Sequence, residues 1–111
     1  MSERLRSNES FLRYLHEAKL KQRNLLLNSC SRNEKKTICE CAFNIAKKNI
    51  PLTEAQITEL RKPKNKKIIY LLADKSIPLE KKWPKVVQSG GSPIALIASI
   101  ISSIVGALAS R

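Results

Sequence analysis

Residues 94–109 read IALIASIISSIVGALA, and this uncharged stretch decides how the rest of the chain is interpreted. No charged side chain occurs from Val86 to Ser110, whereas the residues before Val86 are densely charged. On a helix, the bulky side chains form two adjoining ridges: Ile97, Ile101 and Val105, and beside them Ile100, Ile104 and Leu108. Because no face can hold water, this is not an amphipathic surface helix. We expect these side chains to contact a membrane or a partner.

Small residues recur at every fourth position of the same stretch, at Ala98, Ser102 and Gly106. This spacing lets two helix backbones approach closely, so it predicts self-association through these residues. A helix from Pro93 to Ala109 spans ~25 Å, the short end of the transmembrane range. The stretch is therefore a short membrane anchor, a membrane-active peptide, or a helix buried against a partner or against this chain.

The remainder of the chain is strongly basic. The 111 residues include 21 Lys and Arg against 9 Asp and Glu, a formal charge of +12, and every basic residue except Arg111 precedes Val86. Such a charge density favours a polyanionic partner, either nucleic acid or an anionic membrane surface. The alternative is a solvated basic surface that serves only solubility.

The sequence contains no recognisable catalytic or metal-binding motif. Its three cysteines, Cys30, Cys39 and Cys41, follow an N-terminus without an apolar signal segment, which favours a reducing compartment. Cys39 and Cys41 form a CxC, and the only histidine, His16, is distant in the sequence. We therefore expect buried thiols, no metal, no cofactor and no enzymatic activity.

Local signals predict an all-α fold, a small bundle of four or five short helices plus a separate C-terminal apolar helix. Ser31–Glu34 and Thr53–Gln56 are capping boxes, in which side chains satisfy the first amides of a helix. Pro51, Pro63 and Pro84 should each end or interrupt a helix, because proline disfavours helical geometry at the preceding residue. Strand signals are absent from the sequence, which has no sustained period-two alternation.

Composition divides the chain into four parts. Residues 1–9 are polar and expected to be disordered, 10–87 form a basic helical domain, 88–92 are a Gly-rich hinge, and 93–111 are the apolar helix. This division would fail if Ile97, Ile101 and Val105 packed as the spine of a single bundle.

The lysines are clustered, and the densest cluster surrounds Pro63. The predicted nucleic-acid-binding residues are this cluster and a second one near Trp83, namely Arg61, Lys62, Lys64, Lys66, Lys67, Lys81, Lys82 and Lys85. Lysine neutralises phosphate without reading sequence, so binding should be nonspecific and weakened by salt. The alternative is a solvated linker around Pro63. Trp83 should pack against the helical domain or anchor at a membrane interface.

Three segments carry a resemblance to a known family. They are FLRYLHEAKLKQRNLLLNS (11–29), CECAFNIAKKNIPLTEAQ (39–56) and LRKPKNKKIIYLLADKSIPLEKKWPKVVQSGG (60–91), followed by the apolar tail. Their order resembles the small basic late proteins of Maverick/polinton elements and adintoviruses, which have been likened to the precursor of the adenovirus mu core protein (late protein X). The resemblance covers about residues 10–110 and rests on the order of the segments, because none is a catalytic motif.

The resemblance implies a non-enzymatic virion protein that accompanies packaged double-stranded DNA, with a membrane-active or capsid-docking C-terminal helix. It also implies location in the virion and the host nucleus. Gly90 and Gly91 resemble the processing sites of adenovirus relatives, although Gln88 stands where those sites have an aliphatic residue. The chain also departs from mu, which is short and rich in arginine. The alternative function is a tail-anchored or membrane-active protein on the cytosolic face of an intracellular membrane.

Overall fold

A computed structural model describes the backbone of residues 3–89 and 92–109, and the side chains within them except those of Leu20, Ser92, Ser102 and 104–109. The elements are α1 (Glu3–Ser7), α2 (Glu9–Glu17), α3 (Leu20–Ser29), α4 (Arg32–Ala46), α5 (Glu54–Arg61), α6 (Pro63–Ala73), α7 (Leu79–Gln88) and α8 (Ser92–Ala109). The described residues contain no strand. The predicted all-α class is confirmed, with more and shorter helices than expected.

The predicted helix starts at Ser31 and Thr53 are confirmed in atomic detail. The Ser31 Oγ accepts from the Glu34 amide at 3.1 Å, and the Glu34 carboxylate accepts from the Ser31 amide at 2.9 Å. Thr53 and Gln56 make the same reciprocal pair at 3.1 and 3.0 Å. Pro63 is the first residue of α6, a position where its missing N–H costs no helical hydrogen bond.

Two local predictions are wrong. Residues 3–7 of the segment expected to be disordered form α1, because Leu5 is fully buried in the core and fixes that turn. Pro84 lies inside α7 and does not end it. The carbonyl that proline leaves without an intrahelical donor belongs to Glu80, which is exposed and can bind water.

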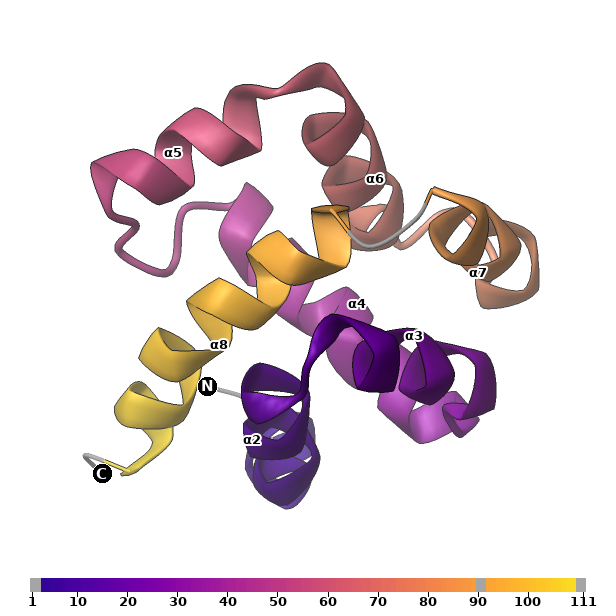
Figure 1. Cartoon of the computed structure of the whole chain (residues 1–111), viewed down its shortest axis with the longest axis horizontal. Helices are drawn as coiled ribbons and strands as arrows, with labels where there is room; N and C mark the ends of the chain where they lie inside the picture. The colour runs from indigo at the N-terminus through magenta and orange to yellow at the C-terminus, as the bar shows by residue number, and fades with distance from the viewer. Residues whose placement is uncertain (1–2, 90–91, 110–111) are drawn as a thin grey trace.

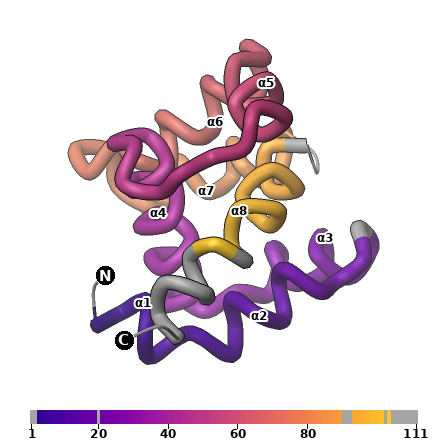
Figure 2. Tube along the Cα trace, turned by 90° about the vertical axis from the view of Figure 1, so that its left-hand side faces the viewer, coloured from indigo at the N-terminus to yellow at the C-terminus, as the bar shows by residue number. Residues whose placement is uncertain are grey.

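The first half of α8 lies at the centre of the molecule and contacts α2, α4, α5 and α6. Figure 1 shows α8 crossing in front of α4, with α5 and α6 on one side and α2 on the other. In the perpendicular view, α8 lies between the layer of α1 and α2 and the layer of α5 and α6 (Figure 2). The radius of gyration is 12.7 Å, close to the ~13 Å of a folded chain of this length.

The prediction of a C-terminal helix is confirmed, but its separation from the bundle is not. Ile94, Ile97, Ile100 and Ile101 are at most 1% exposed and belong to the single hydrophobic core. Burying aliphatic side chains inside this chain gives the same hydrophobic gain as burying them in a partner, without an association cost. Ile97, Ile100 and Ile101 are thus not available to a membrane or partner; the side chains of Ile104, Val105 and Leu108 lie outside the described ones.

The predicted self-association face stays a prediction, although its one residue of described exposure, Ala98, faces the core. Ala98 is 0% exposed, so it cannot pack on a second copy in this structure, and the exposure of Ser102 and Gly106 is outside what the structure describes. Gly90 and Gly91, the predicted hinge and processing site, also lie outside the described residues. None of the described helices combines the length and apolar character needed to cross a membrane.

Side-chain hydrogen bonds reinforce the central position of α8. The ring of His16 on α2 donates from Nδ1 to the Ala98 carbonyl at 2.8 Å, since a carbonyl only accepts. Gln56 on α5 donates to the Ser99 carbonyl at 3.3 Å. On the other side of the bundle, Trp83 is 6% exposed and its Nε1 donates to the Leu27 carbonyl at 3.2 Å. The prediction that Trp83 packs against the helical domain is therefore confirmed.

Candidate functional site

A stripe of long side chains runs along one face of α4. Arg32, Lys36, Glu40, Phe43 and Lys47 follow one another at spacings of three or four residues, which places them on a single side of the helix. The buried residues Ile38, Cys41, Ala42 and Ile45 occupy the opposite side and attach α4 to the core. At 15 residues, α4 gives this stripe a length of about 22 Å.

Three adjoining hollows lie beside α4: residues of this stripe line the first two, and Ile45, Ala46 and Lys48 at the C-terminal end of the helix line the third. The first, about 400 Å³, lies between α1, α4 and the α6–α7 connection. It shares Phe43, Ala73 and Lys75 with a second hollow of about 400 Å³, which shares Ala46 and Tyr70 with a third of about 390 Å³. Adjacent hollows share lining residues, and we call the three hollows together the basic furrow.

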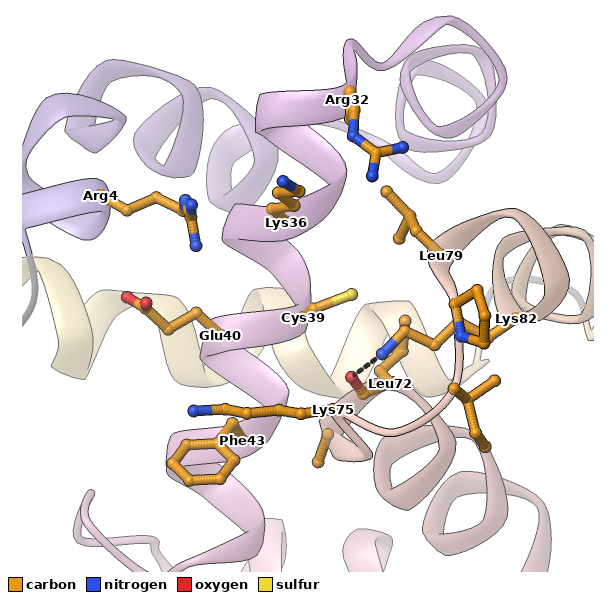
Figure 3. A pocket seen from close by; sticks show the side chains of 13 residues that line it. Arg4, Arg32, Lys36, Cys39, Glu40, Phe43, Leu72, Lys75, Leu79 and Lys82 are labelled. Atoms are coloured by element: carbon orange, nitrogen blue, oxygen red, sulfur yellow. Dashed lines mark hydrogen bonds between the residues drawn. The ribbon is translucent and has the colours of Figure 1, made fainter.

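The furrow is lined by far more positive than negative charge. Its nine basic residues are Arg4, Arg32, Lys36, Lys47, Lys48, Arg61, Lys66, Lys75 and Lys82. The acidic residues among its lining are Glu40 and Asp74. Figure 3 shows the first hollow, with Arg4 approaching α4 from one side, Lys82 and Leu79 on the other, and Lys75 extending across α4 towards Phe43.

Several of these cations have protein contacts that hold them at the furrow without neutralising it. The ammonium groups of Lys75 and Lys47 lie 4.1 and 5.8 Å from the centre of the Phe43 ring, and that of Lys66 lies 5.9 Å from the Tyr70 ring. Such contacts leave the charge of the lysine intact. Arg32 is the exception, because its guanidinium pairs with the carboxylate of Glu80.

Hydrogen bonds lower the pKa of two carboxyl groups, that of Asp74 in the second hollow and that of Glu80 beside Arg32. The hydrogen bond from the Ser76 side chain, with that from the Ser76 amide, holds the pKa of Asp74 below its ordinary value. The hydrogen bond from Arg32 lowers the pKa of Glu80 in the same way. Both carboxyl groups therefore hold their negative charge to lower pH than an ordinary carboxyl group does.

Lys48 reaches the furrow because of how α4 ends. Its φ of 60° is the left-handed conformation, the one non-glycine case among the described residues. The Asn49 amide donates to the Asn44 carbonyl at 2.9 Å and the Lys48 amide to the Ile45 carbonyl at 3.1 Å, which together are a Schellman motif. Glycine is the usual residue at this position, so a lysine there accepts backbone strain while placing a cation at the helix end.

The predicted binding residues are only partly brought together. Arg61 and Lys66 line the third hollow. The others that remain exposed lie outside the furrow, namely Lys62, Lys64, Lys67, Lys81 and Lys85. Lys62 is additionally paired with Glu59 at 2.7 Å. The binding role of these residues stays a prediction.

The prediction for Lys82 needs a correction. Lys82 lines the first hollow, but it is 5% exposed and its Nζ donates to the carbonyls of Leu72 and Asp74, at 2.9 Å each. These carbonyls belong to the C-terminal end of α6, where a positive charge is favourable to the helix dipole. Lys82 is thus first of all a cap of α6, and two of its three N–H bonds are used there.

The cysteines show no activation. Burial raises the pKa of Cys41 to about 12 and that of Cys30 to about 11, and it raises the pKa of Cys39 as well. A thiol that stays protonated is a poor nucleophile and a poor metal ligand. Within the part of the chain that the structure describes, no three His, Cys, Asp or Glu side chains gather as they would around a metal ion.

Sequence reasoning missed most of the furrow. Arg4, Lys36, Lys47, Lys48 and Lys75 were not predicted as binding residues, although the stripe on α4 is visible in the sequence as basic and aromatic residues three and four apart. The contributions of α1 and of the α6–α7 connection could not be seen there, because they depend on tertiary packing.

Comparison of the chain with family models, curated proteins and solved structures finds no match.

Proposed function

We propose that the protein binds nucleic acid through its phosphate groups, without sequence preference, along the basic furrow. The observation that carries this proposal is the convergence of nine basic and two acidic side chains on the three adjoining hollows of the furrow. A strand of B-form DNA offers one phosphate per ~3.4 Å, so a strand lying along the stripe on α4, which is about 22 Å long, presents several phosphates at once. Lysine, the prevailing cation here, neutralises phosphate but does not read base edges bidentately.

Double-stranded DNA packaged in a virion is the expected ligand under the resemblance described above, and the virion and host nucleus are the corresponding locations. This part of the proposal rests on the resemblance alone. The alternative of a membrane-active C-terminal helix would require the side chains of Ile97 and Ile101 to leave the core. It therefore has less support than the nucleic-acid proposal.

A binding assay with unrelated duplexes across a range of salt tests the proposal. We expect similar affinity for every sequence and a linear fall of log K with log salt. Replacing Lys47, Lys48 and Lys75 by glutamine should reduce the magnitude of that slope by about 3, since each phosphate contact contributes about 0.9.

A matched control carries the same loss of charge outside the furrow. Arg6, Lys19 and Lys21 are exposed, do not line the furrow and are not among the predicted binding residues. Their replacement by glutamine should change the slope by less than 1, because only charges that contact phosphate release counterions. An equal effect of the two triple variants would contradict the furrow as the binding surface, and no binding at low salt would end the proposal.

A further inference from the structure

Two aromatic rings lie in the middle of the basic furrow. Phe43 from α4 and Tyr70 from α6 both line its second hollow, and they extend into the first and third hollows respectively. Tyr70 is 45% exposed. Among the described residues, neither ring belongs to the hydrophobic core or to the partly buried side chains packed against it. Packing in the hydrophobic core therefore does not explain why aromatic residues stand at these two positions.

Both rings are accompanied by lysine ammonium groups. Lys66 lies 5.9 Å from the Tyr70 ring, and Lys75 and Lys47 lie 4.1 and 5.8 Å from the Phe43 ring. These three lysines are exposed and have long flexible stems, so they can move from the ring to an approaching phosphate. The lysines lie over the faces of the exposed Tyr70 ring and the half-buried Phe43 ring, so a lysine that moves to a phosphate leaves a ring face on which a base can stack.

We propose that Phe43 and Tyr70 stack on unpaired bases, so that the furrow binds single-stranded nucleic acid more tightly than duplex. This inference rests on the proposed phosphate binding, and it differs from the double-stranded ligand that the resemblance implies. In a duplex the faces of the bases are covered by neighbouring bases, so only the phosphates can contact the furrow near the rings. In an unpaired strand the face of a base is free to stack on each ring. Stacking is tolerant of base identity, which agrees with binding that has no sequence preference.

The test compares ligands that have the same phosphates with and without bases. An oligothymidylate and an abasic oligonucleotide of equal length, each fluorescently labelled, are titrated with the full chain and followed by anisotropy. A duplex of matching length is the third ligand. We expect the chain to bind the oligothymidylate about tenfold more tightly than the abasic strand, and more tightly than the duplex.

Substitutions of Phe43 and Tyr70 test whether these two rings cause the preference for strands that have bases. Tyr70→Leu and Phe43→Leu should each weaken oligothymidylate binding about fivefold and leave binding of the abasic strand within about twofold, whereas Tyr70→Phe should keep the wild-type preference. Tyr14→Leu is the matched control, because Tyr14 is 54% exposed on α2 and does not line the furrow. It should change neither affinity. Circular dichroism of each variant checks that the helices are retained.

The outcomes separate the inference from the proposed function. Equal wild-type affinity for the oligothymidylate and the abasic strand would overturn stacking while leaving phosphate binding in place. A preference for bases that survives both leucine variants would also overturn it, because the bases would then be bound elsewhere. Failure of all three ligands to bind at low salt would overturn the proposed function together with the inference.

Discussion

The ammonium of Lys82 is held inside the protein by the end of a helix. Burying a charge is costly unless hydrogen bonds compensate for its lost hydration. Here the compensation comes from the carbonyls of Leu72 and Asp74, each 2.9 Å from Nζ, and from the negative end of the α6 dipole. Lys82 therefore fastens α7 to the end of α6 and fixes one wall of the furrow.

Replacement of Lys82 by methionine should lower the free energy of unfolding by about 1–3 kcal/mol. Methionine keeps the aliphatic stem but removes the donor of the Leu72 carbonyl, and it leaves the Asp74 carbonyl with the Ile77 amide at 3.4 Å. Lys81→Met is the control, since Lys81 is exposed, and it should cost less than about 0.5 kcal/mol. Urea unfolding followed by circular dichroism measures both variants. Equal effects of the two would show that Lys82 has no capping role.

The buried thiols predict a loss of stability at alkaline pH. Burial raises the pKa of Cys30 to about 11 and of Cys41 to about 12, from an ordinary value of 9.0. Between pH 9 and these values the unfolded chain releases thiol protons that the folded chain retains. Because the unfolded state then binds fewer protons, the free energy of unfolding falls as pH rises.

The free energy of unfolding should be lower by about 1 kcal/mol per buried thiol at pH 10 than at neutral pH. Below about pH 8 the thiols should have no effect on it. Comparing the wild type with Cys41→Ala at pH 7.5 and pH 10 isolates it, since all other titrating groups are common to both. The stability difference between the two proteins should narrow as pH rises. An unchanged difference would show that the Cys41 thiol ionises as readily in the folded chain as in the unfolded one.

At the scale of elements, α8 determines whether the basic helices have a core. Ile94, Ile97, Ile100 and Ile101 fill the space between α2 on one side and α5 and α6 on the other. Without them, the apolar faces of those helices would be exposed to water. A processing event after Gly91 would thus leave α8 bound noncovalently in the core or unfold the remainder.

The substitution Ile97→Ala should lower the free energy of unfolding by about 2–5 kcal/mol, because it leaves a cavity in a fully buried position. Ser103→Ala on the same helix is the control; Ser103 is exposed, and the change should be within about 0.5 kcal/mol. Thermal unfolding measures the two side by side. If Ile97→Ala were as mild as Ser103→Ala, α8 would have to be independent of the bundle in solution.

Over the whole molecule, the described helices share a single hydrophobic core. Leu5 of α1, Trp83 of α7 and Ile101 of α8 belong to the same cluster of buried residues. A small domain with one core unfolds cooperatively. We therefore expect one transition in urea, with the fluorescence of Trp83 and the far-ultraviolet circular dichroism changing at the same midpoint.

A second transition that reports only on helix content would contradict this expectation. It would indicate that part of the chain unfolds independently of the surroundings of Trp83. Repeating the experiment on Ile97→Ala shows whether both signals move together, as they should when one core supports them. Separate shifts of the two midpoints would count against the single core.

The helix boundaries could be predicted from the sequence more completely than the residues of the candidate site. The starts at Ser31 and Thr53 and the break at Pro63 depend on residues within one turn of one another, so they can be recognised without tertiary structure. The prediction that Pro84 ends a helix was wrong because the carbonyl that it leaves without a donor, that of Glu80, is on the exposed face of α7 and can bind water. In the site, Arg61 and Lys66 were predicted among the residues that line the furrow, whereas the role of Lys82 depends on the distant end of α6.

The sequence itself determined the all-helical class, the positions of the capped helices and the excess of positive charge. Each of these follows from residue types and from residues close together in the chain. Only the tertiary structure decided that the apolar face of α8 turns inward and that cations from α1, α4, α5 and α6 line one furrow. The physical reason is that apolar surface can be buried against any available apolar surface. Which surface is available, and which lysines are left beside one another, depends on how elements far apart in the chain pack together.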